Sequence, residues 1–136
     1  MRVESRARAR ALQALYAWDV RGTVPLDRIA ERVWDDLAIS PEERRFAGAL
    51  VRTILRSGEE IDAQLAAVTT NWRLSRLGVV ERSVLRLAAA EFVQGTTPAR
   101  VVIKESMRLA ERYGTTESAR FVNGVLDAYA RRKGLL

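Results

Sequence analysis

The sequence predicts an all-α protein, and three observations support this prediction. Apolar residues recur every three or four positions along most of the chain, which is the spacing of helices that bury one face. No segment shows the strict alternation of apolar and polar residues that is typical of half-buried strands. A serine or threonine directly before proline, an arrangement that often starts a helix, occurs twice. We therefore expect a series of amphipathic helices.

Two helices are predicted in the first forty residues. The first begins near Ser5, a residue type favoured at N-caps, and ends before Gly22, because glycine readily adopts the left-handed backbone found at helix ends. The second runs from Leu26 to just before Ser40. Its apolar positions repeat at helical spacing and are Ile29, Ala30, Val33, Trp34 and Leu37.

The third helix has the clearest start in the chain. Ser40 can cap it, Pro41 suits the first helical position, and Glu43 completes a capping box. Apolar residues at helical spacing then continue to about Asn71, although Gly58 is a point where the helix can bend or divide. The sequence does not decide whether this segment forms one helix or two.

A structured connection is predicted at residues 71–78, which combine turn-forming polar residues with large apolar ones. The next helix extends from about Val80 to Phe92 and is closed by Gly95. Glu91 lies among its apolar residues, and we interpret this side chain as ion-paired or hydrogen-bonded rather than catalytic, since a buried carboxylate needs partners.

Two further helices are predicted in the last forty residues. Thr97 followed by Pro98 predicts the start of a helix that ends before Gly114, and the final helix begins around Thr116. Gly124 lies inside the final helix because helical spacing continues through it. Glycine costs a helix about 1 kcal/mol relative to alanine, so we expect another backbone to pass close to this position.

The composition excludes several classes of chemistry. The 136 residues suffice for one domain with a buried core, so we expect a single domain over residues 1–136. There is no cysteine or histidine, and no catalytic constellation or phosphate-binding glycine loop is recognisable. We expect no enzymatic activity, no cofactor and no bound metal. No apolar run could span a membrane and no secretory signal follows the basic start, so a cytoplasmic location is expected.

The charge distribution favours a nucleic-acid partner. A net charge of +6 fits a polyanionic ligand, although arginines that only solvate the surface would give the same value. Clustering favours binding, because the first ten residues contain Arg2, Arg6, Arg8 and Arg10. Along a helix Arg6, Arg10 and Gln13 share one side, where arginines can hold phosphates and the amide can contact a base edge. Arg2 extends this side, and Arg8 projects toward the apolar side but stays a candidate contact.

Two aromatic residues and a second basic stripe complete the candidates. Tyr16 lies at the edge of the basic side, where it could stack on a base, contact a partner or pack in the core. Trp18 lies on the apolar side, which favours the core. Arg100, Lys104 and Arg108 repeat once per helical turn.

Three stretches can be compared with a known family. The arginine-rich start leads into Ala11-Leu12-Gln13-Ala14-Leu15-Tyr16, the middle contains Leu77-Gly78-Val79-Val80-Glu81-Arg82-Ser83-Val84-Leu85-Arg86-Leu87-Ala88, and the end contains Phe121-Val122-Asn123-Gly124-Val125-Leu126-Asp127. In this order they resemble the NusB family of bacterial transcription antitermination factors. The resemblance implies a NusB-like bundle of about six to seven helices in two packed three-helix-like halves.

The same resemblance implies a function and partners. It implies binding to the boxA element of ribosomal RNA leader transcripts together with NusE, a small-subunit ribosomal protein, so that RNA polymerase resists premature termination. Matching positions imply RNA contacts at Arg6, Arg8, Arg10, Gln13, Glu117 and Phe121. They imply NusE contacts at Tyr16 and Glu81.

The chain departs from the family pattern at three positions. Ala9 stands where glutamate is common, which makes the first helix more basic, and Ala90 stands where an aromatic residue usually precedes Glu91. Lys104 stands where asparagine is typical.

Alternatives of other classes stay open. The domain also resembles the N-terminal module of a ribosomal-RNA cytosine methyltransferase, which without a catalytic domain after Leu136 would be only an RNA-binding module. A protein-interaction module whose arginines meet acidic proteins is a further alternative. A homodimer would cover the basic helix until a partner arrives and a monomer would leave it exposed, and the sequence fits both. It also does not define the RNA bases contacted or whether NusE is needed for tight binding.

Overall fold

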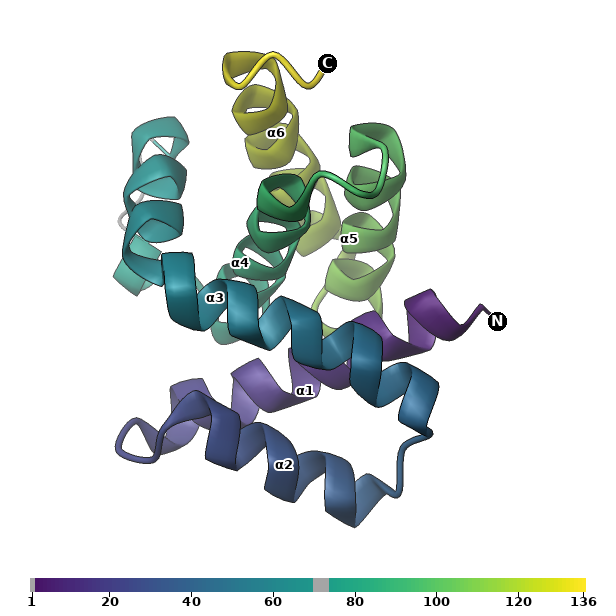
Figure 1. Cartoon of the computed structure of the whole chain (residues 1–136). Coiled ribbons are helices and arrows are strands. Elements are labelled where there is room, and N and C mark those ends of the chain that lie inside the picture. The colour runs from purple at the N-terminus through teal and green to yellow at the C-terminus, as the bar shows by residue number, and fades with distance from the viewer. Residues whose placement is uncertain (1, 70–73) are drawn as a thin grey trace.

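The computed structural model describes residues 2–69 and 74–136, and these form helices joined by short connections, with no strand among them (Figure 1). The prediction of an all-α protein is confirmed. The helices are α1 (Val3–Arg21), α2 (Leu26–Leu37), α3 (Pro41–Val68), the short 3-10 helix η1 (Leu74–Arg76), α4 (Val79–Gln94), α5 (Ala99–Tyr113) and α6 (Thr116–Arg132).

Helix α1 begins earlier than the sequence predicts. Arg2 is its N-cap and provides no side-chain cap, so the prediction that Ser5 caps this helix is wrong. The Ser5 hydroxyl instead donates to the carboxylate of Glu105 on α5 and thus joins two helices distant in sequence. The C-terminus agrees with the prediction, since Gly22 adopts the left-handed conformation with φ of 70°.

Helix α3 is one helix with a kink. The capping box is present, because Ser40 Oγ accepts from the Glu43 amide at 3.1 Å and the Glu43 carboxylate accepts from the Ser40 amide at 3.4 Å. At Ser57 the backbone leaves helical geometry with φ of −120° and ψ of 15°, next to Gly58. The bend therefore occurs where the sequence suggested it. The predicted connection at residues 71–78 is described from Leu74 onward, and its first three residues lie outside the described ranges.

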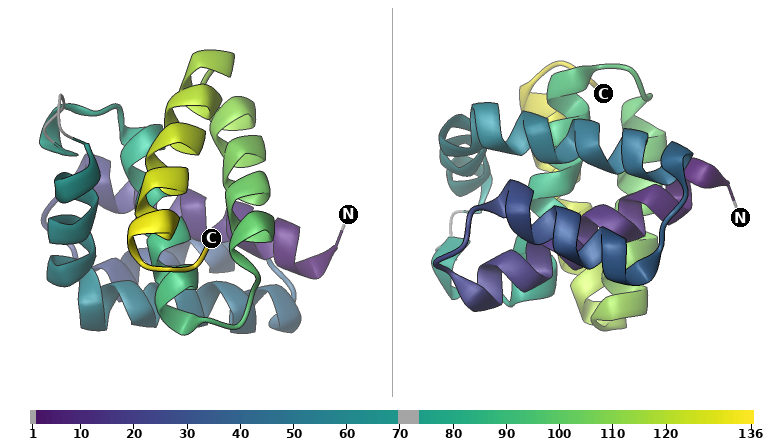
Figure 2. Two further views of the ribbon diagram at one scale, coloured as in Figure 1. Left: turned by 90° about the horizontal axis from the view of Figure 1, so that it is seen from above. Right: turned by 60° about the horizontal axis from the view of Figure 1, so that its bottom comes forward.

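The helices form two groups of three that share one core. In Figure 1, α1, α2 and the first part of α3 run across the molecule, whereas α4, α5 and α6 stand upright beside them, and Figure 2 shows the same crossing from two other directions. Helix α4 lies centrally and packs on α1, α3, α5 and α6. All six α helices contribute to the buried apolar cluster, for example through Leu15, Leu26, Leu50, Leu85, Val102 and Leu126.

Two local predictions in the second half are corrected. Pro98 is the N-cap of α5 rather than its first helical residue, and Thr97 does not cap the helix. Gly124 is exposed, and a Cβ added there would meet no atom within 4 Å, so the expected close backbone is not present and nothing in the structure explains this glycine. Among the described residues, none of the helices combines the length and apolarity needed to cross a membrane.

Candidate nucleic-acid interface

The outer face of α1 displays the predicted basic side. Small residues such as Ala7, Ala11 and Ala14 are fully buried on the opposite face, which lets α1 approach its neighbours closely. Arg2 is exposed, and the side chains of Arg6 and Arg10 keep 40% and 28% of their surface accessible. Gln13 is half-buried and Tyr16 is 47% exposed. The structure thus leaves these five predicted contact residues at least partly accessible, with Arg6, Arg10, Gln13 and Tyr16 along one face of α1 and Arg2 at its N-cap.

Glu43 fixes the orientation of these arginines. Its carboxylate accepts from Arg10 Nε at 3.1 Å and lies 4.0 Å from Arg6 Nε, while Arg10 Nη1 donates to Gln13 Oε1 at 3.3 Å. Burial raises the pKa of Glu43, but hydrogen bonds from Arg10 and from Ser40 outweigh it and leave the pKa below its ordinary value. The glutamate of the α3 capping box therefore also orients the arginines of α1, a link that the sequence pattern did not reveal.

Arg8 differs from its neighbours because its side chain is buried. It is 5% exposed, and its guanidinium donates two hydrogen bonds of 2.8 Å to Glu91 and one of 3.3 Å to Glu105. Burial lowers its pKa, but the hydrogen bond and charge of Glu91, with Glu105 and Glu4, raise the pKa above its ordinary value overall. Arg8 has no exposed guanidinium for RNA, so we correct the expectation of a direct contact. The interpretation of Glu91 as an ion-paired glutamate is confirmed.

A second cluster lies where α4 and α6 begin. Glu81, Glu117 and Phe121 line one shallow cavity of about 330 Å³, together with Arg76, Leu77, Gly78, Thr115 and Ser118. Ser118 Oγ donates to Glu81 Oε1 at 3.0 Å, which holds this carboxylate in place. Gly78 permits the arrangement, because a Cβ there would lie 2.6 Å from Glu81 Oε2. The structure thus places Glu81 with the two α6 residues, and Tyr16 does not line this cavity.

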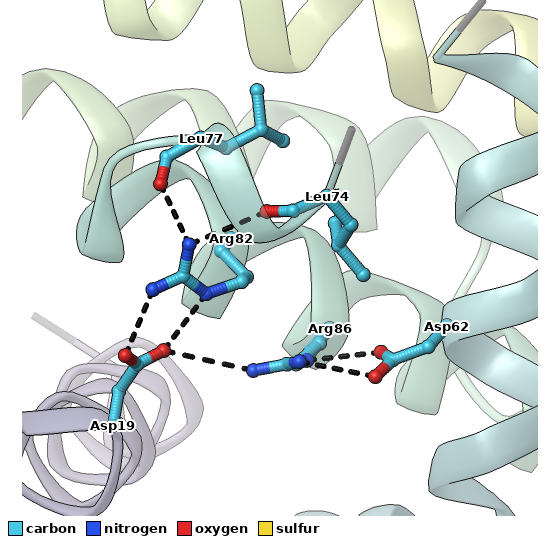
Figure 3. Close-up of polar contacts among 6 residues, drawn as sticks. All are labelled: Asp19, Asp62, Leu74, Leu77, Arg82 and Arg86. Atoms are coloured by element: carbon cyan, nitrogen blue, oxygen red, sulfur yellow. Dashed lines mark hydrogen bonds and ion pairs between the residues drawn. The ribbon is translucent and has the colours of Figure 1, made fainter. Parts of the chain in front are cut away.

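Two arginines of α4, Arg82 and Arg86, join this helix to α1, to α3 and to the segment before α4 (Figure 3). Arg82 donates to both carboxylate oxygens of Asp19 at 2.8 Å and to the carbonyl oxygens of Leu74 and Leu77 at 3.3 and 2.6 Å. Its pKa is raised, chiefly by the hydrogen bond with Asp19. These bonds join α1 to α4 and hold the segment that leads into Gly78.

Arg86 extends the network to α3. It pairs bidentately with Asp62 at 2.9 and 3.0 Å, and its Nη1 lies 3.7 Å from Asp19 (Figure 3). Its guanidinium also lies 5.7 Å from the ring centre of Trp18, which packs partly buried against the core as expected. The sequence shows these arginines four residues apart, but their carboxylate partners are distant in sequence and could not be assigned.

Metal chemistry has no assembled site in the described part of the chain. Within residues 2–69 and 74–136, acidic side chains nowhere gather in threes as a metal site would require. The described helices and the arginines of α1 define the class of the protein, a small all-helical protein with a basic face on its first helix.

Comparisons with known proteins identify the family. The NusB family model matches residues 5–131. The transcription antitermination protein NusB of Anaeromyxobacter dehalogenans (strain 2CP-1) is 43% identical over 129 residues, which cover 93% of this chain and 89% of that protein. The structure of T. maritima NusB superimposes with a TM-score of 0.88 at 34% identity and covers 94% of this chain and 90% of that one.

A second solved structure resembles the chain as closely. It contains the antitermination factors NusB and NusE in complex with double-stranded RNA, and it matches with a TM-score of 0.86 at 34% identity over 97% of this chain and 98% of that one. The chain therefore belongs to the NusB family of transcription antitermination proteins, and it is not an enzyme.

Proposed function

We propose that this chain binds boxA-type RNA of ribosomal RNA leader transcripts together with NusE, as a single RNA-binding domain in the cytoplasm. In this role it joins the RNA polymerase antitermination complex and supports processive synthesis of ribosomal RNA. A related NusB has been solved with NusE and double-stranded RNA, which supports RNA and NusE as partners. The observation on which the proposal chiefly rests is the arginine face of α1, whose orientation is set by Glu43.

The geometry suggests separate roles for the residues of this face. Arg2, Arg6 and Arg10 present guanidinium groups suited to phosphate oxygens. The Gln13 amide is positioned beside Arg10 and can contact a base edge, since amides read donor and acceptor patterns. Arg8 acts indirectly in this scheme, because its buried ion pairs fix α1 against α4 and α5.

Partner binding is assigned to two other places. Tyr16 is an exposed aromatic side chain at the edge of the arginine face, as expected for a residue that contacts NusE. Glu81 would contact NusE from the cavity at the start of α4, and Glu117 and Phe121 on its other side would lie next to the RNA.

Competition between RNAs tests the proposal. Labelled boxA RNA bound to the protein is displaced by unlabelled boxA RNA or by a scrambled RNA of equal length, with and without NusE. We expect boxA RNA to compete at concentrations at least about tenfold lower, because base contacts add sequence discrimination to phosphate binding. Equal competition by both RNAs would contradict the proposal.

A parallel titration with NusE tests the assignment of Glu81. Calorimetry of Glu81→Ala should show weaker NusE binding and little change in RNA binding by the isolated protein. The Ser118→Ala variant keeps the Glu81 carboxylate but removes its hydrogen bond from Ser118, together with the contacts of Ser118 Oγ with Thr115, and it serves as a control for loss of this local structure. If Glu81→Ala weakens the binding of NusE and of RNA equally, the assignment of Glu81 to NusE binding is contradicted.

A further inference from the structure

The outer face of α5 forms a continuous row of positive charge. Arg100, Lys104, Arg108 and Arg112 are all exposed and lie four residues apart, so they follow one another on successive turns. From the first to the last the row spans about 18 Å, at about 1.5 Å per residue. We call these four residues the α5 basic row. The opposite face of α5 is buried through Val102, Ile103, Ser106, Leu109 and Ala110.

The charge of this row is little compensated. Among the described residues, no carboxylate lies within salt-bridge distance of Arg100, Lys104 or Arg112. Arg108 lies 3.6 Å from Glu105, but that carboxylate already accepts from Arg8 at 3.3 Å. The row therefore keeps most of its positive potential, which is favourable for a polyanion.

The row is adjacent to the N-terminal end of α1. Ser5 and Arg8 line a small cavity of about 100 Å³ together with Arg108 and Arg112, so the two helices meet at this point. In Figure 1 the first turns of α1 lie beside the end of α5 from which the chain continues into α6. Arg2 and Arg6 lie at this same end of the chain, as the N-cap and within the first turns of α1, so the α5 basic row lies close to the end of α1 that carries these arginines.

The chemistry of the row favours a phosphate backbone over an acidic protein. Protein interfaces are enriched in arginine as well, but they are built around buried aromatic or apolar anchors, whereas Val101, at 42% exposure, is the one large aliphatic side chain exposed among residues 99–113. Arginines and a lysine in a line suit phosphates spaced along a strand, since such contacts position RNA without reading its sequence.

We propose that the α5 basic row binds the phosphate backbone of RNA that flanks the boxA element. This inference rests on the proposed function, because it extends the RNA path from α1 onto α5. It assigns to α5 a contribution that does not depend on base sequence but requires RNA longer than the specific element.

RNA length separates the two surfaces in an experiment. Fluorescence anisotropy is measured with a minimal boxA RNA and with the same RNA extended by about ten nucleotides on either side, long enough to reach beyond the α1 face. Both lengths are also made with a scrambled core. The variant Lys104→Gln/Arg108→Gln is compared with the parent and with Arg28→Gln/Arg32→Gln, which removes two exposed arginines of α2 and so matches the change in charge.

The parent should bind the extended RNAs more tightly than the minimal ones, whichever core they contain. The α5 variant should lose most of the affinity that the parent gains from the longer RNA. With extended RNA, the slope of log affinity against log salt concentration should be smaller in magnitude by about 1.4, which is about 0.7 for each of the two lost phosphate contacts. The α2 control should retain the gain, and binding of minimal boxA should be similar in all three proteins.

Other outcomes overturn the inference. The row is not an RNA contact if the α5 variant gains as much affinity from the longer RNA as the parent does. The same conclusion follows if the α2 control loses as much of this affinity as the α5 variant. Binding of a polyglutamate peptide is measured with the same three proteins. If the α5 variant binds this peptide more weakly but binds all the RNAs like the parent, the row contacts an acidic protein and the inference is wrong. Equal binding of boxA and scrambled cores would instead contradict the proposed function, while the comparison of lengths would still test α5.

Discussion

Arg8 and Arg10 lie two residues apart on α1 in opposite surroundings. The guanidinium of Arg8 is enclosed with Glu91 and Glu105, whereas Arg10 lies at the surface beside Glu43. Helical periodicity placed Arg8 near the apolar side but could not show its partners, which are 83 and 97 residues away in sequence. A contact of such long range depends on how helices pack, and this limited the prediction of the site.

Replacing Arg8 should destabilise the protein strongly. The Arg8→Met variant leaves the carboxylate of Glu91 buried without its cation, and loss of one partner of a buried ion pair costs about 3–5 kcal/mol. Urea denaturation followed by circular dichroism measures the free energy of unfolding. The double variant Arg8→Met/Glu91→Leu should recover much of the loss, because it removes both charges. An Arg8→Met protein as stable as the parent would refute the structural role.

Glu43 should make stability depend on pH in the acid range. Its pKa in the folded protein lies below the ordinary value of 4.5, so the ionised carboxylate stabilises the fold above that pH. This contribution disappears as the pH falls through the folded-state value and the carboxylate is protonated. The Glu43→Gln variant should therefore be less stable at neutral pH and lose less stability on acidification. The free energy of unfolding is measured by urea titration of both proteins at several pH values. If it changes with pH in the same way in the variant and in the parent, the role of Glu43 is contradicted.

Helix boundaries were predictable where short-range chemistry determines them. The capping box at Ser40 and the left-handed ends at Gly22 and Gly95 involve residues at most four positions apart, and the structure agrees at all three. Errors occurred where side chains had distant partners or where the proline took a different position, as at Ser5 and Pro98. Local sequence thus determined the ends of most helices but not how the helices contact one another.

Arg82 should be more important for joining helices than an ordinary surface arginine. The Arg82→Lys variant keeps the positive charge but loses the planar guanidinium that donates to Asp19 and to the carbonyl oxygens of Leu74 and Leu77. We expect the free energy of unfolding to fall by about 2 kcal/mol. Arg131→Lys is the matched control, because its pair with Asp127 is exposed and within one helix and should change stability by less than about 0.5 kcal/mol. Equal effects in denaturant titrations would show that the network does not join the helices.

At the scale of the whole molecule, two groups of three helices support surfaces made from distant parts of the chain. The α1 face depends on Glu43 of α3, and the cavity with Glu81 combines α4 with α6. The all-helical class followed from apolar periodicity, and the arrangement in halves followed from resemblance to a family. Neither the periodicity nor the resemblance predicted that Glu81 shares a cavity with Phe121 or that the guanidinium of Arg8 is buried with its partners, because both arrangements arise from tertiary packing.

The central claim is that the arginine face of α1 binds RNA. The most direct test is a titration of boxA RNA at several salt concentrations with Arg6→Gln/Arg10→Gln, beside Arg28→Gln/Arg32→Gln as a control of equal charge, after circular dichroism has shown that both are folded. We predict weaker binding by the α1 variant and a log–log salt slope lower by about 1.4, with the control close to the parent. A folded α1 variant that binds boxA RNA with the affinity and salt dependence of the parent would contradict the account.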